Sequence, residues 1–81
     1  MSALRVLSSA GDTTYVWDRA AVEAHDAEAE AAVLEAERVF ASARRGGATA
    51  FSVPGGSATV RIDKFDRTAE QIILVPRIVG G

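Results

Sequence analysis

Few residues of this 81-residue chain are of the types that perform covalent chemistry. The sequence has no cysteine, which excludes disulfides, thiolate nucleophiles and sulfur-ligated metal sites. It contains no G-x-S-x-G nucleophile motif and neither of the glycine-rich phosphate-binding motifs, G-x-x-x-x-G-K-S/T and G-x-G-x-x-G. We therefore predict that the chain is not an enzyme, has no catalytic residues and uses no cofactor.

His25 is the one histidine, and the acidic side chains around it are the best local set of metal-ligating types. These carboxylates are Glu23, Asp26, Glu28 and Glu30. Because charged runs on helices usually face water, we interpret the set as a solvated helix face and predict no metal site.

The C-terminal segment is the part of the chain whose residue types indicate a reaction. Gly80 and Gly81 have no side chains, so an extended tail could thread a narrow channel and present its carboxylate without steric shielding. Pro76 lacks a backbone N–H and should end sheet pairing before the tail begins. Such a tail suits a carboxylate that another protein activates.

Charge and hydropathy narrow the range of partners. Nine lysines and arginines against eleven acids give a net charge of −2, which argues against a general nucleic-acid binder. Residues 1–5 lead into no apolar segment of the kind found in signal peptides, and the apolar run 72–75 is far shorter than the ~20 residues of a membrane helix. We expect a cytoplasmic protein with no nucleic-acid or membrane partner. Its Ala- and Arg-rich composition is typical of a GC-rich prokaryotic gene.

The residue pattern of the first half of the chain predicts a hairpin followed by a helical region, which belong to the domain that carries this tail. Residues 4–9 and 13–17 favour strands around a turn at residues 10–12, and we expect Trp17 to pack beneath the helix. Residues 18–45 contain no Gly or Pro and favour helix. Asp18 and Asp26 are each suited to cap a helix, and a break at residues 25–26 would separate a short first turn from the main helix.

Apolar residues recur at helical spacing within this region and predict one buried stripe. The stripe consists of Ala29, Val33, Ala36, Phe40 and Ala43, with Ala32 and Val39 beside it. Gly46 and Gly47 follow the helix and predict a left-handed cap at its end.

The second half predicts another hairpin and a final strand. Residues 48–53 and 58–63 favour strands around a turn at 54–57, and residues 64–71 favour a loop or one helical turn. The final strand begins near Ile72 and is apolar on both faces, which is typical of the middle of a sheet. If one helix covers one face of that sheet, Ile73 and Val75 lie on the open face, where we expect a partner surface.

The order hairpin, helix, hairpin, last strand predicts a two-layer α+β domain with one main helix on a four- or five-stranded sheet. This order matches the β-grasp fold. A ferredoxin-like split βαβ would need a second long helix, which the sequence does not offer. We expect one β-grasp domain, residues 1–76, followed by a flexible tail, residues 77–81.

The last dozen residues resemble the ending of the molybdopterin-synthase small subunits and related β-grasp sulfur carriers. The matching positions are Glu70, Ile72, Leu74, Val75, Pro76, Ile78, Gly80 and Gly81. The ending also resembles that of archaeal and bacterial ubiquitin-like modifiers. The resemblance implies that an E1-like enzyme adenylates the carboxylate of Gly81, which is then thiocarboxylated or joined to an amine of a target protein.

The same resemblance implies partner contacts along the tail, at Pro76, Arg77, Ile78 and Val79. Besides the E1-like adenylating enzyme, it implies an E2-like enzyme, a JAB-type peptidase or a sulfur-accepting enzyme as partners. Arg77 departs from the sulfur carriers, which tend to have Pro or a small residue there, and is more similar to the Arg of ubiquitin-type tails. Carrier and modifier therefore both stay open. The alternative is a non-catalytic β-grasp interaction domain with no tail activation.

Overall fold

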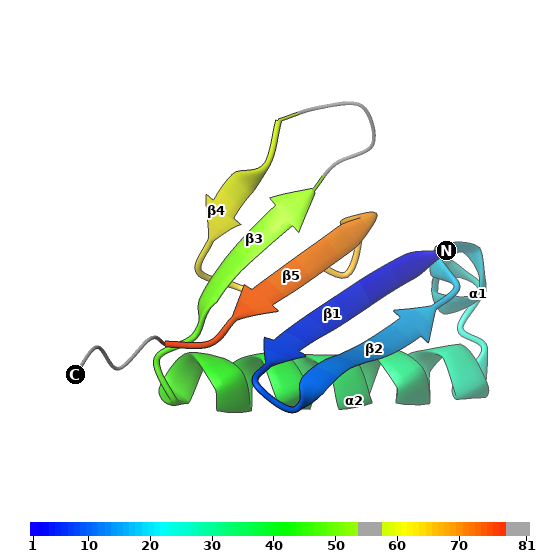
Figure 1. The fold of residues 1–81 in the computed structure, drawn as a ribbon. Coiled ribbons are helices and arrows are strands. Elements are labelled where there is room, and N and C mark those ends of the chain that lie inside the picture. Colours follow the sequence, from blue (N-terminus) through cyan, green and yellow to red (C-terminus); the bar gives the residue numbers. More distant parts are fainter. Residues whose placement is uncertain (54–57, 78–81) are drawn as a thin grey trace.

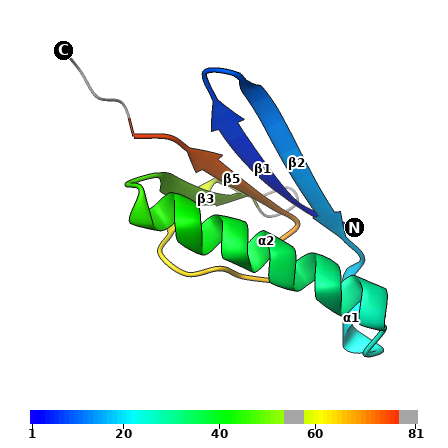
Figure 2. The same cartoon turned by 90° about the horizontal axis from the view of Figure 1, so that it is seen from below.

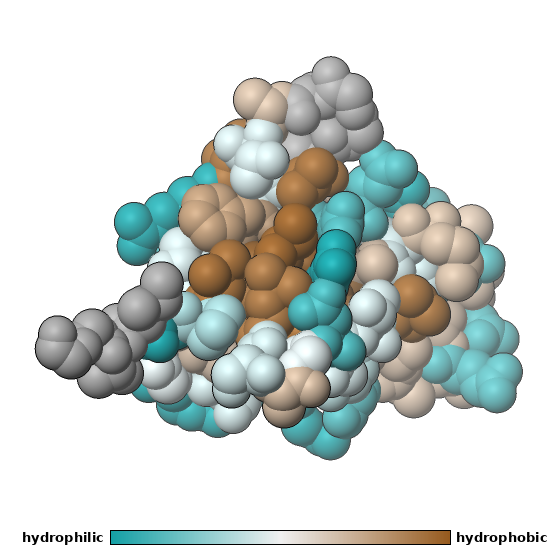
Figure 3. All heavy atoms as spheres, viewed as in Figure 1, coloured by the Kyte–Doolittle hydropathy of each residue, from teal (hydrophilic) through white to brown (hydrophobic). Residues whose placement is uncertain are grey.

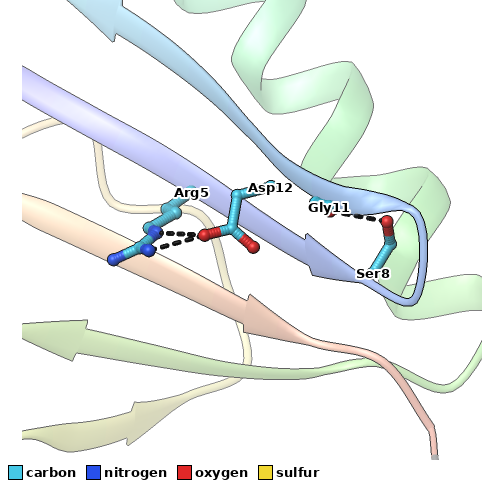
Figure 4. Close-up of polar contacts among 4 residues, drawn as sticks. All are labelled: Arg5, Ser8, Gly11 and Asp12. Carbon is cyan, nitrogen blue, oxygen red and sulfur yellow. Dashed lines mark hydrogen bonds and ion pairs between the residues drawn. The ribbon is translucent and has the colours of Figure 1, made fainter.

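The computed structural model describes residues 1–53 and 58–77. Strands β1 (Ser2–Ser8) and β2 (Gly11–Trp17) form an antiparallel hairpin, as predicted, but its turn lies at residues 9–10 rather than 10–12. The side chain of Ser8 explains this position. Its hydroxyl donates to the Gly11 carbonyl at 2.7 Å (Figure 4). The same hydroxyl accepts from the Ala10 N–H at 3.3 Å, and together the two bonds close the turn one residue early.

The helical region is divided at the predicted place. Helices α1 (Arg19–Glu23) and α2 (Ala27–Arg45) are separated by His25, whose φ of 59° lies in the left-handed region. The carboxylates of Asp18 and Asp26 accept backbone N–H groups in the first turns of α1 and α2. Each therefore caps one helix by satisfying donors that have no partner inside the helix.

One side of α2 packs on the sheet through the predicted stripe. Its buried residues are Ala29, Val33, Ala36 and Phe40, and the partly buried residues beside them are Ala32, Val39 and Ala43. The helix ends at Gly46, and Gly47 follows with a φ of 95°, which confirms the predicted left-handed cap. Within the part of the chain that the structure describes, no helix is both long and apolar enough to cross a membrane.

Three further strands complete the sheet: β3 (Thr49–Val53), β4 (Val60–Ile62) and β5 (Gln71–Val75). β4 is shorter than the strand predicted at residues 58–63. It forms a sheet edge, and its Val60 remains 53% exposed, so lengthening it would bury little apolar surface. Residues 64–70 form a loop, as expected. The turn predicted at residues 54–57 lies outside the described residues.

The strand order is β2-β1-β5-β3-β4, with β1 and β5 parallel and all other neighbours antiparallel. β5 is therefore an interior strand, as its two-sided apolarity predicts. The two helices lie on one face of the sheet, and no described element covers the other, which we call the open face (Figures 1 and 2). The chain forms a small two-layer α+β structure with a five-stranded mixed sheet and one main helix.

The core lies between α2 and the covered face of the sheet. Its least exposed large strand residues are Leu4, Ile72, Leu74 and Trp17. The Trp17 indole N–H donates to the carbonyl of Arg67 at 3.0 Å, and the Trp17 ring lies 5.5 Å from that of Phe65. The loop between β4 and β5 is thereby held against the core, and the predicted core position of Trp17 is confirmed.

Candidate functional site

The four consecutive apolar residues of β5 are divided between the two faces of the sheet. Ile72 and Leu74 point toward α2 and belong to the core. Ile73 and Val75 alternate with them and lie, half-buried, on the open face. Their predicted position is therefore confirmed, while their role as a partner surface stays a prediction.

Neighbouring strands place more apolar side chains beside these two. Phe51 of β3 pairs with Ile73, and Val53 follows on the same face of β3. On the other side of β5, Arg5 of β1 is the partner of Ile73, and Leu7 is the next residue of β1 on that face. The open-face patch therefore consists of Leu7, Phe51, Val53, Ile73 and Val75. Figure 3 shows it as a brown area over β5 and β3.

Charged side chains border the open-face patch. On one side Arg5 binds Asp12 of β2, with the Arg5 Nε atom 3.1 Å from Asp12 Oδ2 (Figure 4). On the other side Arg61 of β4 pairs with Phe51 and is exposed. The open-face patch thus has a guanidinium group on each lateral side, and the guanidinium of Arg5 is paired with a carboxylate.

The predicted tail begins at the edge of this patch. Pro76 follows Val75, which is the last residue of β5 and pairs with Thr49, so pairing ends where the missing N–H of Pro76 predicts. Pro76 and Arg77 are exposed and line a groove of about 380 Å³ between β1 and the end of α2. The other lining residues are Val6, Leu7, Ala43, Gly46, Ala48 and Leu74. Because Leu7 belongs to both, the groove and the open-face patch are continuous.

The remaining residues of the predicted tail are Ile78, Val79, Gly80 and Gly81, and they lie outside the described residues. They attach at Arg77, whose side chain lies against Gly47 at the C-terminal end of α2. Figure 2 shows the described part of the chain ending beside that end of the helix.

The two ends of α2 differ in charge. The end beside the tail carries Arg44 and Arg45 in its last turn, with Arg77 close by. Arg44 donates to the carbonyl of Ala48 at 2.8 Å and lies 3.3 Å from the carboxylate of Asp63. The acids near the opposite end are Asp18, Glu23, Asp26, Glu28 and Glu30. The tail therefore leaves from the basic end of the molecule.

The carboxylates around His25 are arranged as caps and exposed side chains. The nearest of them, Glu30, has its Oε1 atom 3.2 Å from Nδ1 of His25, whose side chain is 86% exposed. Asp26 is engaged as the cap of α2. In residues 1–53 and 58–77 no group of three or more His, Asp or Glu side chains is placed to hold a metal ion.

Sequence reasoning identified Ile73 and Val75 but missed the other three members of the open-face patch, Leu7, Phe51 and Val53. A signal for β3 was present, because Phe51 lies between the small residues Ala50 and Ser52, which face the helix. For Leu7 the sequence carries no such signal, since its place depends on the parallel register of β1 and β5.

Comparisons with protein-family models, with curated proteins and with solved structures find no match to this chain.

Proposed function

We propose that this chain is a β-grasp carrier or modifier protein of the ubiquitin-like kind. An E1-like enzyme adenylates the carboxylate of Gly81, which is then thiocarboxylated or joined to an amine of a target protein. The observation that best supports the proposal is the place at which the tail begins. It begins at the end of the interior strand β5, immediately beside the open-face patch, so one partner could bind the patch and receive the tail.

The order of the elements supports the β-grasp assignment. The last strand lies between two hairpins, β1–β2 on one side and β3–β4 on the other, and one main helix covers a single face. This is the arrangement that the order hairpin, helix, hairpin, last strand implies.

The proposed chemistry needs the domain to present a carboxylate rather than to catalyse. A carboxylate oxygen of Gly81 attacks the α-phosphorus of ATP, and pyrophosphate leaves. A sulfur or amine nucleophile then attacks the acyl carbon, and AMP leaves. Adenylation turns a poor electrophile into a reactive one, and the side-chain-free glycines allow close approach to it.

The charges around the tail indicate the kind of surface that binds it. The open-face patch is bordered by Arg5 and Arg61, and Arg77 and Arg45 lie at the basic end of the molecule. We therefore expect the E1-like partner to offer an apolar depression with acidic residues around it. Charge complementarity of this kind speeds association more than it adds affinity.

Removal of Gly80 and Gly81 tests the proposal. The truncated chain should fold normally, because the deleted residues lie beyond the strands and helices that form the core. It should lose all ATP–pyrophosphate exchange with the E1-like enzyme that activates the full-length chain. If the truncated protein complements a deletion strain as well as the full-length chain does, the tail is not activated.

A matched pair of variants tests the open-face patch separately. Val75→Thr and Val60→Thr make the same isosteric change, but only Val75 belongs to the patch, and Val60 lies on the edge strand β4. Val75→Thr should weaken binding of the E1-like enzyme and Val60→Thr should not. Equal binding by both variants would remove the patch from the proposed docking surface.

The open-face patch also favours the second candidate function, a non-catalytic interaction domain, because docking through a sheet face needs no tail. The two functions differ in one result. An interaction domain would lose its activity in cells with Val75→Thr and keep it after deletion of Gly80 and Gly81.

A thiocarboxylate on Gly81 of protein isolated from cells would favour a carrier, whereas an amide bond from Gly81 to a lysine would favour a modifier. Self-linked chains have few acceptors, because Lys64 is the one lysine in the sequence and Met1 supplies the N-terminal amine. Both residues are exposed, so mass spectrometry of conjugates from a Lys64→Arg variant with a blocked N-terminus should find no self-linkage.

A further inference from the structure

Arg77 and Gly47 meet at the base of the tail. Arg77 follows β5 and Gly47 follows α2, so their contact joins the ends of two elements that form the core. A Cβ atom added to Gly47 would lie 3.0 Å from Cδ and 3.4 Å from Cβ of Arg77. The aliphatic stem of Arg77 therefore lies directly against Gly47, at the position that a side chain would occupy in any other residue.

The cap of α2 holds Gly47 in place. The Gly47 N–H donates to the carbonyl of Arg44 at 3.0 Å, and the Ala48 N–H donates to that of Ala43 at 3.0 Å. The φ of 95° at Gly47 is one that residues with a side chain rarely adopt. The same glycine thus closes the helix and leaves a bare surface for the Arg77 stem.

The groove at the base of the tail also contacts Arg77. Apolar atoms of Ala43, Leu74 and Pro76 line it, and the methylene stem of an arginine can cover apolar surface while its guanidinium stays in water. The residue at which the chain leaves the domain is therefore held by the end of α2 and by the groove.

We propose that Arg77 is a positioning residue whose aliphatic stem, packed on Gly47, sets the point and direction from which the tail leaves the domain. This rests on the proposed activation of Gly81. If a partner docks on the open-face patch, a displacement at Arg77 moves the point from which the last four residues start, and so changes the region that the carboxylate of Gly81 can reach. Misplacing a reacting group by about 1 Å can cost on the order of 100-fold in rate.

Two substitutions separate the stem from the charge. Arg77→Met keeps an unbranched stem and removes the guanidinium, whereas Arg77→Ala removes both. If the stem acts through Gly47, Arg77→Met behaves as wild type and Arg77→Ala does not. If instead the guanidinium binds the partner, both variants are impaired, and the proposal is wrong.

The first measurement uses the free protein and needs no partner. Because the sequence has no cysteine, Gly81→Cys accepts a single nitroxide label. Paramagnetic broadening of the backbone amides then reports which surface the end of the tail visits. Arg77→Met should keep the wild-type broadening profile and Arg77→Ala should change it. Identical profiles for wild type and Arg77→Ala would overturn the proposal.

A double-mutant cycle tests the contact with Gly47. Gly47→Ala should change the broadening profile in the wild-type background and change it little in the Arg77→Ala background, where the stem that the new methyl group would displace is absent. The strain of an alanine at a positive φ is the same in both backgrounds, so it cancels in the cycle. Gly46→Ala is the matched control, because Gly46 has an ordinary φ of −78°. An equal effect of Gly47→Ala in both backgrounds contradicts the proposal. If circular dichroism shows that Gly47→Ala does not fold, the proposal is tested by the broadening profiles of Arg77→Met and Arg77→Ala alone.

The last measurement is ATP–pyrophosphate exchange with the E1-like enzyme that activates the wild-type chain. A docked chain with a misdirected tail binds normally but reacts slowly. We therefore expect Arg77→Ala to lower kcat about 3- to 10-fold with KM within about twofold of wild type. A raised KM in both Arg77 variants would assign the role to the charge and overturn the proposal. If no E1-like enzyme activates the wild-type chain while the label behaves as expected, the proposed function fails and the Arg77–Gly47 contact stands.

Discussion

The covered and open faces of β5 carry similar pairs of large aliphatic residues, and the open face also carries Gln71 at the start of the strand. Ile72 and Leu74 face α2 with 0% and 1% exposure, while Ile73 and Val75 on the open face stay half-buried. Nothing in the side chains distinguishes the two pairs, so the difference comes from the single helix, which covers one face. One apolar strand thus supplies two residues of the core and two residues of the open-face patch.

The borders of the two faces differ as well. On the covered side, Trp17, Phe65 and Phe40 form an aromatic cluster. The ring of Phe65 lies 5.5 Å from that of Trp17 and 5.7 Å from that of Phe40. The open-face patch is bordered by Arg5 of β1 and Arg61 of β4. Aromatic rings seal a core from water, whereas charged borders keep an apolar patch in solution until a partner covers it. The comparison indicates that side chains on the covered face contribute most to stability, whereas the open face is the surface on which we propose that a partner docks.

The largest expected effect separates the two faces directly. Leu74→Ala should lower the free energy of unfolding by about 2–5 kcal/mol, because it leaves a cavity against α2. Val75→Ala removes fewer buried atoms and should cost about 1 kcal/mol or less. Urea denaturation of both variants measures the difference. If Val75→Ala costs as much as Leu74→Ala, the open face is part of the core and the division between the faces is wrong.

The features that could be predicted from the sequence are local ones. The caps at Asp18 and Asp26, the break at His25 and the glycine cap at Gly47 each depend on a few neighbouring residues. The interior place of β5 could also be predicted, because a strand that is apolar on both faces must be flanked by other strands.

The features that could not be predicted depend on contacts between distant segments. Leu7 joins the open-face patch only through the parallel register of β1 and β5, and for Phe51 the sequence indicates the face of β3 but not its partner Ile73. The stem of Arg77 meets Gly47 only because β5 and α2 end at the same side of the molecule. A one-residue change of register would move each strand residue to the other face, and no single segment encodes that choice.

A smaller difference in stability is expected when a single methylene group is removed from each face of β5. Ile72→Val and Ile73→Val delete the same group on opposite faces of β5. We expect Ile72→Val to cost about 1 kcal/mol of unfolding free energy and Ile73→Val less than about 0.5 kcal/mol. Equilibrium urea unfolding at a fixed pH resolves the two. Equal costs would show that the open face is packed as tightly as the covered one.

The two faces can also be compared through one hydroxyl group on each, that of Ser2 and that of Thr49. Ser2 is fully buried on the covered face, and its Oγ atom has no hydrogen-bond partner among the described residues. Thr49 is half-buried on the open face, beside Val75. Ser2→Ala should raise the free energy of unfolding by about 0.5–1 kcal/mol, because it removes an unsatisfied buried group. Thr49→Val should change it by less than about 0.5 kcal/mol. Thermal unfolding of the pair tests this, and a destabilised Ser2→Ala variant would mean that the hydroxyl has a partner.

The smallest effect on stability is expected at the border of the open face, where Arg5 binds Asp12. Both side chains are well exposed, at 47% and 40%, and exposed ion pairs contribute about 0–1 kcal/mol. Asp12→Asn should therefore change the free energy of unfolding by less than about 0.5 kcal/mol. The control is Asp63→Asn, which removes an exposed carboxylate that pairs with Arg44, on a residue outside the open-face patch.

The same substitution should have a larger effect on binding than on folding. Without Asp12, the guanidinium of Arg5 is no longer neutralised, so the open face becomes more basic. If the E1-like partner surrounds its apolar depression with acids, Asp12→Asn should speed association, and the gain should disappear at high salt because exposed charges are screened there. Stopped-flow association rates at low and high salt measure this. A slower association would mean that the Arg5–Asp12 pair itself fits the partner, so that the border of the patch is recognised as an ion pair rather than as a positive charge.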